Sequence, residues 1–329
     1  MTLFPLSRVS LIDTSGLLHR AVHSPQGQRV SEYNQNAWAG PTYIFYQSIL
    51  AITQRFTNPI FVLDGYPKAK HDLFPAYKAQ RKAQREKDPN YEFQKEVRKQ
   101  LRNWVFETIP TVIAYSPFEE ADDCIGSLAA QLNEKGYRVD ILSSDKDIWQ
   151  LRTPSTHVWR VGGEGLEEIT QEMSDEEYGV PADKIPHYKA WFGDKSDNLP
   201  KIFRMPTKVA TALINGTKDL DEAVEKLPEF VAGDWLPKFE QFVEQARINF
   251  DLATIRKDLQ VPFAYFAPES KSLQNILDAY KIKDFTATNL FVKLASGQRS
   301  TLEILVECGL LNGQTVLSYE TLLNKPKAG

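Results

Sequence analysis

Cysteine, long apolar runs and secretion signals are scarce or absent in this sequence. The 329 residues include two cysteines, Cys124 and Cys308, which lie far apart and form no pair with the spacing of metal ligands. The first residues lack the basic start, apolar run and cleavage site of a signal peptide, and no apolar run approaches the length of a membrane span. We therefore expect a cytoplasmic protein with reduced thiols and no membrane partner.

The histidines and glycines form none of the common catalytic patterns. The five histidines include no H-E-x-x-H segment and no paired ligands, so a zinc hydrolase is not indicated. The clustered glycines of VGGEGLEE (161–168) have neither P-loop nor G-x-G-x-x-G spacing, and they favour a turn over a nucleotide site.

Net positive charge is also lacking, which at first sight argues against a nucleic-acid partner. The formal charge is −4, and the contents of 42% hydrophobic and 25% charged residues are ordinary for a globular protein. The charges are segregated, however, because residues 68–102 contain eleven Lys or Arg and five Asp or Glu, a local charge of +6. This basic segment requires an explanation.

Short, β-branched apolar runs alternate with longer segments of helical spacing. This order predicts an α/β fold, with a parallel sheet covered by helices on both faces. Beyond about residue 170 the pattern is mostly helical, and the length allows a smaller second domain. The predicted strands are residues 8–13, 59–64, 111–115, 138–143 and 157–161. The predicted helices include 37–56 and 121–136, and the polar residues 24–36 predict a loop.

Acidic residues follow the first four predicted strands at the point where each strand ends. A further acidic pair lies three residues apart in GDKSDN and would share one face if that segment were helical. Because ligands of open parallel sheets bind outside the carboxyl ends of the strands, we expect these side chains to converge. The nine acids are Asp13, Asp64, Glu120, Asp122, Asp123, Asp145, Asp147, Asp194 and Asp197.

Nine converging carboxylates repel one another unless cations lie between them. Oxygen ligands, with no histidine or cysteine at these positions, suit hard ions such as Mg²⁺ or Mn²⁺. Carboxylates around two such ions are the arrangement used for phosphodiester cleavage. Each acid alone has a simpler interpretation, as a helix N-terminal residue or a turn residue, and it is their joint occurrence that favours a metal site.

The basic segment contains PAYKAQRKAQREK (75–87), which predicts a helix with cations on one face. The spacing i, i+3, i+4, i+7 joins Lys78, Arg81, Lys82 and Arg85. Like-charge pairs four residues apart destabilise a helix, so a phosphate-binding surface explains the stripe better than an ordinary solvated face. Tyr77 adjoins the stripe and is a candidate for stacking on a base.

Together these motifs resemble the 5′-nuclease family, which includes flap endonucleases, the 5′→3′ exonuclease domain of bacterial DNA polymerase I, and stand-alone phage 5′-nucleases such as the phage RNase H. LIDTSGLLHRA is similar to the family's first strand and helix. FVLDG and FPAYKAQR are similar to its second metal motif and its basic helix. EADDCIGSLA, SSDKDIWQL and GDKSDNLP are similar to its remaining metal motifs.

The resemblance implies a PIN-like nuclease and a role for each acid. The first five acids in chain order would bind one Mg²⁺ ion and the last four a second, with Mn²⁺ as a substitute. Lys78 and Arg81 match the basic pair that contacts the scissile phosphate. The implied activity is metal-dependent hydrolysis of phosphodiester bonds near 5′ ends of DNA, as exonuclease and flap endonuclease, with removal of RNA primers as a further option.

The implied organisation is a catalytic domain over residues 1–190 and a helical duplex-binding domain over 191–300. An arch at about 66–103 would admit the 5′ strand. The role of residues 301–329 is left open.

One departure from the family concerns its glycine-rich helix-turn-helix, where backbone amides and a bound K⁺ grip duplex phosphates. In this chain the corresponding region, about residues 198–215, contains KIFRMPTKVATALI and no glycine. Tight turns with positive φ are hard to build without glycine, so the K⁺ site is in doubt. Arg204 and Lys208 are the candidate phosphate contacts in this region.

The implied substrates are DNA with a 5′ flap or 5′ end and, as an option, an RNA–DNA hybrid. A monomer in the cytoplasm (the host's, for a phage protein) would serve replication or repair, with a single-strand-binding protein or polymerase clamp as a candidate recruiter. Two rival functions stay open. A haloacid-dehalogenase-type phosphatase needs D-x-D on the first strand, whereas Asp13 is followed by Thr14 and Ser15. A catalytically retired DNA-binding scaffold is disfavoured by the complete acid motifs.

Overall fold

The computed structural model describes residues 7–162, 165–281 and 287–311. The chain forms two compact units. The sheet unit comprises Met1–Tyr66, Asp88–Ser144 and Lys257–Gly329, and the helical unit comprises Pro67–Lys87 and Asp145–Arg256. The chain therefore leaves the sheet unit twice, once after β2 and once after β4. The predicted arch (66–103) is shared between the two units, and the predicted boundary at residue 190 stays a prediction.

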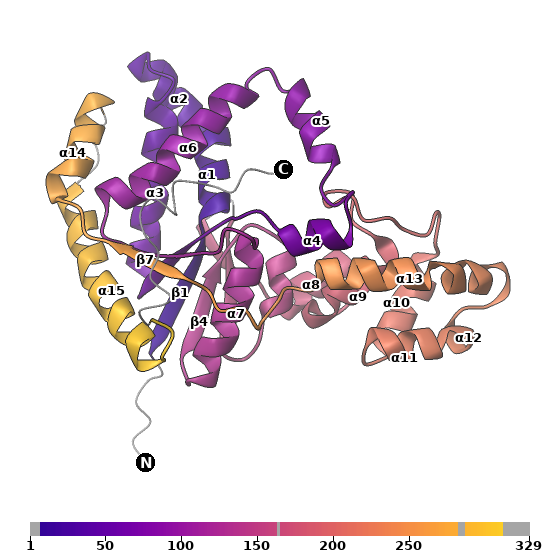
Figure 1. The fold of residues 1–329 in the computed structure, drawn as a ribbon. Helices are drawn as coiled ribbons and strands as arrows, with labels where there is room; N and C mark the ends of the chain where they lie inside the picture. The colour runs from indigo at the N-terminus through magenta and orange to yellow at the C-terminus, as the bar shows by residue number, and fades with distance from the viewer. Residues whose placement is uncertain (1–6, 163–164, 282–286, 312–329) are drawn as a thin grey trace. The chain divides into compact units, whose positions relative to one another are not determined.

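The strands of the sheet unit lie in the order β4-β1-β2-β3-β7 (Figure 1). The first four in sequence pair in parallel, as predicted, and β7 pairs antiparallel to β3 at the edge. Strands β2 and β3 are buried throughout, which explains their continuous apolar sequences. The strands are β1 (Arg8–Asp13), β2 (Pro59–Leu63), β3 (Thr111–Tyr115), β4 (Arg138–Leu142) and β7 (Phe263–Phe266). The sequence pattern did not indicate β7.

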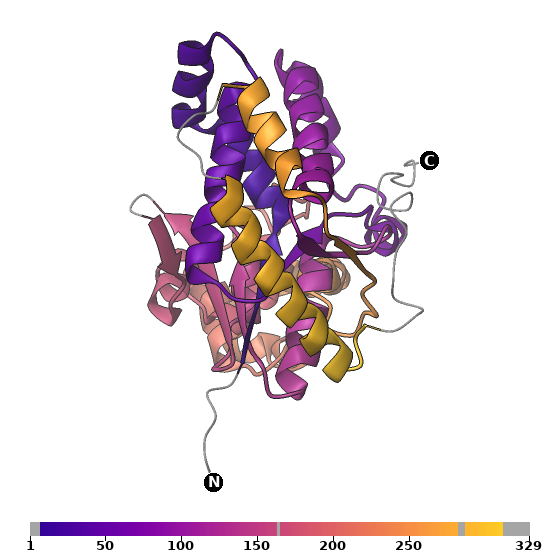
Figure 2. The same cartoon turned by 90° about the vertical axis from the view of Figure 1, so that its left-hand side faces the viewer.

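The direction of the connections places helices on both faces of this sheet. The chain moves one way from β1 to β3 and then returns to β4, and right-handed crossovers put α7 on the face opposite to α1 and α3. Helix α7 contacts β1 and β4, while α15 contacts β2, β3 and α3 (Figure 2). The helices are α1 (Thr14–His23), α2 (Pro25–Asn34), α3 (Ala39–Arg55), α6 (Tyr91–Thr108), α7 (Ala121–Glu134), α14 (Ser270–Ala279) and α15 (Ala287–Glu307).

The predicted loop over residues 24–36 is wrong, because Pro25–Asn34 forms helix α2. Ser24 caps the helix by accepting a hydrogen bond from the Gly27 N–H, Pro25 occupies the first turn, and Gln35 ends the helix in a left-handed conformation. Gly27 lies against Gly40 of α3, where a Cβ on Gly40 would approach the Gly27 carbonyl oxygen to 1.8 Å. The close approach of two helices at paired glycines explains why a polar segment is helical here.

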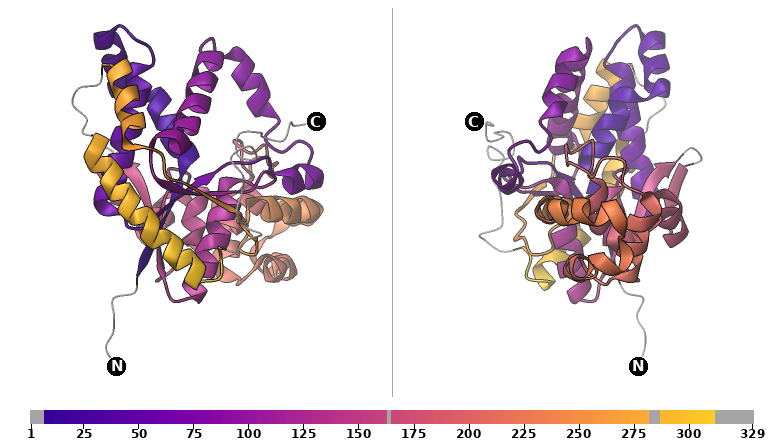
Figure 3. Two further views of the ribbon diagram at one scale, coloured as in Figure 1. Left: turned by 60° about the vertical axis from the view of Figure 1, so that its left-hand side comes forward. Right: turned by 90° about the vertical axis from the view of Figure 1, so that its right-hand side faces the viewer.

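The helical unit is built mainly from short helices, as the sequence predicted beyond residue 170 (Figure 3). The predicted strand at 157–161 is β5, which forms an antiparallel pair with β6. The elements are α4 (Lys68–Leu73), α5 (Gln80–Lys87), η1 (Asp147–Leu151), β5 (Thr156–Gly162), β6 (Gly165–Glu168), α8 (Gln171–Tyr178), η2 (Ala182–Lys184), α9 (Ile185–Phe192), α10 (Thr207–Gly216), α11 (Leu220–Glu225), α12 (Leu227–Phe230), η3 (Gly233–Trp235) and α13 (Leu236–Ala253).

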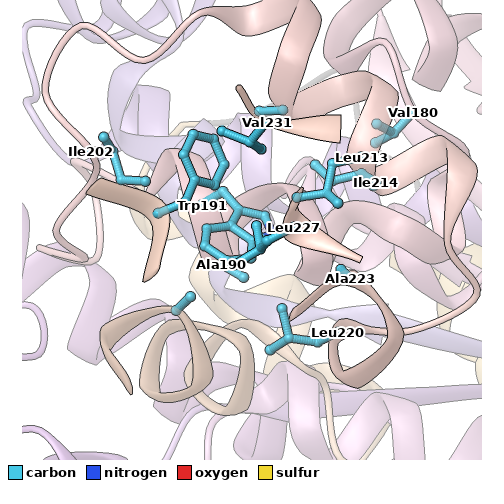
Figure 4. Close-up of a cluster of buried hydrophobic side chains, with 13 residues drawn as sticks. Val180, Ala190, Trp191, Ile202, Leu213, Ile214, Leu220, Ala223, Leu227 and Val231 are labelled. Carbon is cyan, nitrogen blue, oxygen red and sulfur yellow. The ribbon is translucent and has the colours of Figure 1, made fainter. Parts of the chain in front are cut away.

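The core of the helical unit surrounds Trp191, which is fully buried (Figure 4). Helix α9 carries Trp191 and packs along α13, with Phe239 of α13 at 5.2 Å between ring centroids. Burying a ring of this size contributes about 2–3 kcal/mol to the stability of the unit. This core fixes α9 and the turn that follows it, from which two of the predicted metal ligands project. None of the described helices is long and apolar enough to cross a membrane.

Candidate active site

Three of the predicted acids meet in the helical unit. Asp147, Asp194 and Asp197 each place a carboxylate oxygen within 4.8 Å of the others. Asp147 begins η1. The Asp147 N–H donates to the carboxylate of Asp145, so that residues 145–147 form a local turn. Asp145 is exposed beside this group. In the part of the chain that the structure describes, this is the one group of three or more acids that lie so close together. The convergence of all nine acids stays a prediction.

Asp194 and Asp197 do not share a helix, contrary to the conditional prediction for GDKSDN. They lie in a tight turn closed by the backbone pairing of Asp194 with Leu199. The carboxylate of Asp194 accepts hydrogen bonds from the Ser196 N–H at 2.6 Å and the Ser196 hydroxyl at 2.7 Å. Gly193 opens the turn at φ +63, where a Cβ would lie 2.4 Å from the carbonyl oxygens of Leu199 and Pro200. Only glycine fits this position without moving the acids.

Lys189 of α9 places its ammonium group between two of these carboxylates, and sequence reasoning did not find it. Its side chain pairs with Asp147 and Asp194, and the residue is 6% exposed. Burial opposes the charge of Lys189, but the two carboxylates outweigh burial and raise its pKa. Burial raises the pKa of the Asp147 carboxyl. Burial would also raise the pKa of the Asp194 carboxyl, but the charge of Lys189 outweighs it and lowers that pKa. The protein therefore already holds one positive charge at this site.

The third acid, Asp197, is held by the predicted basic pair. Its Oδ1 lies 2.9 Å from the Arg81 guanidinium and 3.6 Å from the Lys78 ammonium. The backbone N–H of Lys78 also donates to the Asp197 carbonyl oxygen at 3.0 Å. Burial raises the pKa of Asp197 despite Lys78. Three acids and three cations, with Lys189 included, thus share one small region of the helical unit.

The basic segment is not one continuous helical stripe. Helix α5 begins at Gln80, and Lys78 precedes it in a left-handed conformation at φ +55, so Lys78 does not share the helix face of Arg81 and Arg85. Arg85 is exposed on α5, and the side chain of Lys82 lies outside the described residues.

Tyr77 is 1% exposed, and its hydroxyl is directed at Asp197. A ring buried in this way is not accessible for stacking on a base, which corrects the prediction. Tyr77 instead packs with Leu199 and Leu252 beneath the acidic turn.

In the sheet unit, Asp13 and Asp64 lie at the ends of β1 and β2 and are joined through Ser15. Asp13 caps α1 by accepting from the N–H groups of Ser15 and Gly16, and it accepts from the Ser143 hydroxyl at 2.7 Å. The Ser15 hydroxyl donates to Asp64. Parallel pairing of β1 with β2 brings the two strand ends together, as predicted. The serines were not predicted, although the segment DTSG contains Ser15.

Glu120, Asp122 and Asp123 open α7, as predicted. The Ala121 N–H donates to Asp64 at 2.9 Å, which ties this helix start to the end of β2. Gly65 allows the approach, because a Cβ there would lie 2.0 Å from the Ser116 carbonyl oxygen. Asp123 is fully buried beside Cys124, and burial together with Asp123 raises the pKa of that thiol to about 12. Cys124 is therefore a packed, unreactive thiol.

The donor chemistry of both units fits a hard cation. All candidate ligands are carboxylate oxygens, partly or fully buried apart from Asp145, and in the helical unit they already surround an ammonium group. Arg204 and Lys208 lie elsewhere in this unit, exposed, on the turn before α10 and in its first turn. These features define an α/β protein with a candidate cation site at strand and turn ends.

Comparison with known proteins agrees with this class. Residues 8–179 match the family described as 5′-3′ exonuclease, N-terminal resolvase-like domain, and residues 180–284 match 5′-3′ exonuclease, C-terminal SAM fold. The thermostable DNA polymerase I of Thermus aquaticus is 30% identical over 264 residues, which cover 79% of this chain and 30% of that polymerase. The 5′-3′ exonuclease of Buchnera aphidicola is 32% identical over 151 residues, 44% of this chain and 52% of that protein.

Among solved structures, a T5 5′-exonuclease with bound zinc has the same fold, with a TM-score of 0.59, 17% identity, and coverage of 90% of this chain and 99% of that chain. The chain belongs to the 5′-3′ exonuclease family. The resemblance seen in the sequence and the predicted fold class are thereby confirmed. The chain spans about a third of the length of the T. aquaticus polymerase that it matches.

Proposed function

We propose that this chain is a divalent-metal-dependent 5′ nuclease that hydrolyses DNA near 5′ flaps and 5′ ends and leaves a 5′-phosphate. The observation that carries the proposal is the group of Asp147, Asp194 and Asp197 around the Lys189 ammonium. A site that holds a buried cation between carboxylates is suited to bind a hard metal ion. Family membership supports the 5′ direction.

We further propose two Mg²⁺ ions, with Mn²⁺ as a substitute. Asp13, Asp64, Glu120, Asp122 and Asp123 would hold the first, and Asp145, Asp147, Asp194 and Asp197 the second. When bound, such ions supply positive charge that activates water and stabilises the leaving oxygen. The zinc-bound T5 relative supports a divalent cation. No K⁺ site is proposed, since the turn before α10 contains no glycine.

The chain's own cations would act on the scissile phosphate. Lys78 and Arg81 converge on Asp197, which holds both side chains in place before substrate arrives. Their positive charges would bind the non-bridging phosphate oxygens and stabilise the charge that develops during cleavage. The Ser143 hydroxyl would orient Asp13, and the Ser15 hydroxyl would orient Asp64.

The remaining predicted contacts stand as proposals. Lys82 and Arg85 would bind phosphates of the single strand, and Arg204 and Lys208 those of the duplex. An RNA–DNA hybrid as substrate, a single-strand-binding protein or clamp as partner, a monomeric state and a cytoplasmic location belong to the same proposal. They rest on the sequence resemblance alone.

Cleavage of an end-labelled 5′-flap DNA tests the proposal. The native chain should cut near the junction with Mg²⁺, and not with EDTA. Asp147→Asn should lose most activity, whereas the matched control Asp183→Asn should retain it, because Asp183 is exposed in the same unit and lies outside the acidic group. Tight flap binding without cleavage in Mg²⁺ or Mn²⁺ would refute the nuclease and favour the scaffold.

A further inference from the structure

Two histidines lie side by side on the exposed side of helix α1. His19 and His23 are four residues apart, which places them on one face of the helix, and both side chains are exposed. Their ring centroids are 4.3 Å apart, and the ring planes are inclined by 39°. We did not expect paired histidine ligands from the sequence, and this pair corrects that expectation.

The nitrogen atoms of both rings are available to an external ligand. Within the residues that the structure describes, neither ring forms a hydrogen bond or an ion pair. Other histidines differ in this respect, because His157 is paired with Glu168 and His187 is buried. The two rings of α1 therefore present unengaged imidazole nitrogens at the surface of the sheet unit.

Both imidazoles should be neutral at pH 7, and the neutral ring is the form that binds a metal ion. Partial burial, the His23 ring and the charge of Arg98 lower the pKa of His19. Burial and Arg98 also lower the pKa of His23, while the carboxylate of Asp88 opposes this shift. Arg98 lies on α6, which contacts α1, and Asp88 precedes α6. The pair thus has one positive and one negative group nearby.

We propose that His19 and His23 together bind one transition-metal ion of the class of Zn²⁺, Ni²⁺ and Cu²⁺. Two histidines four residues apart on a helix direct nitrogens to a single ion, as in helical zinc sites. Imidazole nitrogen suits these ions, whereas Mg²⁺ prefers oxygen. In the described part of the chain, no other histidine, cysteine or acidic side chain forms a group of three with this pair. Water would therefore occupy the remaining positions around the ion.

This site differs from the proposed Mg²⁺ sites in its residues and in its class of ion, so it does not depend on the proposed function. An anion such as phosphate is the alternative ligand, and Arg98 distinguishes the two. The guanidinium repels a bound cation but would attract an anion. Arg98→Gln should therefore tighten the binding of a metal ion, whereas it would weaken the binding of an anion.

Metal binding is measured on the full chain without DNA, in excess Mg²⁺. The variants are His19→Gln and His23→Gln, with His157→Gln as the control that removes a histidine of the helical unit. Because the acidic groups are common to all of these proteins, differences between them isolate the histidine pair. Both histidines of α1 are exposed, so each variant should fold, which thermal melting in EDTA verifies.

Titration calorimetry with Ni²⁺ should show that either α1 variant loses at least about tenfold in affinity, whereas His157→Gln matches the native chain. Arg98→Gln should bind Ni²⁺ more tightly than the native chain. The electron paramagnetic resonance spectrum of bound Cu²⁺ should show coupling to two imidazole nitrogens in the native chain and to one in each α1 variant. Added Ni²⁺ should raise the melting temperature of the native chain more than that of either variant.

Equal Ni²⁺ affinities of the native chain and both α1 variants would overturn the inference, and so would a native Cu²⁺ spectrum with a single nitrogen. Weaker Ni²⁺ binding by Arg98→Gln would also overturn it. Cleavage of flap DNA by the native chain with Mg²⁺ is measured separately and decides the proposed function. Because the binding measurements contain no DNA, failure of the nuclease and failure of the histidine site are distinguishable.

Discussion

The ammonium group of Lys189 lies 2.5 Å from the carboxylate of Asp194, in a region of the helical unit that is closed to most solvent. Asp147 approaches the same ammonium from the start of η1. The positive charge of Lys189 thus compensates two acids that we propose as metal ligands. Replacing Lys189 with an uncharged residue, and then adding metal, tests whether a metal ion can take over the role of this positive charge.

Lys189→Met should destabilise the chain by roughly 3 kcal/mol in metal-free buffer, because two buried carboxylates lose their counter-charge. Added Mg²⁺ or Mn²⁺ should restore part of this loss by binding to the same carboxylates. Denaturant unfolding with and without metal measures both effects. Equal metal-free stability of variant and native chain would contradict the assignment.

Gly193 lies in the acidic turn, and Gly233 at the start of η3 is its matched control, since both have positive φ near +60. Gly193→Ala should cost more than about 2 kcal/mol of unfolding free energy, because its Cβ would overlap two carbonyl oxygens. Gly233→Ala should cost only about 1 kcal/mol, since no atom lies within 4 Å of its Cβ. Thermal or urea unfolding distinguishes the two, and equal losses would show that the turn can relax.

Lys78→Gly should leave stability within about 1 kcal/mol of native, because glycine suits φ +55 and offsets the loss of the ion pair. Cleavage of flap DNA should fall by at least about a hundredfold if the lysine binds the reacting phosphate. Gln35→Gly, at φ 51 just after the end of α2, is the control for the backbone change. Retained cleavage in Lys78→Gly would remove Lys78 from the proposed catalytic pair.

The buried side chain of His187 should make the folded chain less stable in mild acid. Burial and Lys184 lower its pKa below 6.5, while Asp219 and Asp183 oppose this shift. As the pH falls below about 6.5, the unfolded chain therefore binds more protons at His187 than the folded chain does. The stability that neutral, buried His187 contributes is complete above about pH 6.5 and is lost as the pH falls through the pKa of the folded state. His187→Gln should show a flatter decline in unfolding free energy between pH 7 and pH 5. An identical decline in both proteins would exclude His187 as the cause.

The sequence predicted the features set by local pattern. The apolar runs of β1 to β5 follow from strand periodicity, and the acids after β1 to β4 follow from the rule for parallel sheets. Strand β7 was missed because an edge strand of four residues, FAYF, has little periodicity to detect. Helix α2 was missed because its stability comes from Ser24 capping and from contact with α3 rather than from an apolar stripe.

The contents of the site were harder to predict than its location. Lys189 precedes Asp194 by five residues across a glycine turn, and no helical spacing relates the two. The buried position of Tyr77 depends on Leu199 and Leu252, which are distant in sequence. Contacts of this kind arise from tertiary packing, which periodicity does not describe.

The central claim is that the acids of both units serve one cleavage reaction. We would measure flap cleavage by Asp64→Asn, by Asp194→Asn and by the double variant, with Asp183→Asn as control. The account predicts that each single variant loses at least about a thousandfold in rate and that the double variant is little worse, since residues that act together are not additive. Full cleavage by either single variant, or multiplied losses in the double variant, would contradict it.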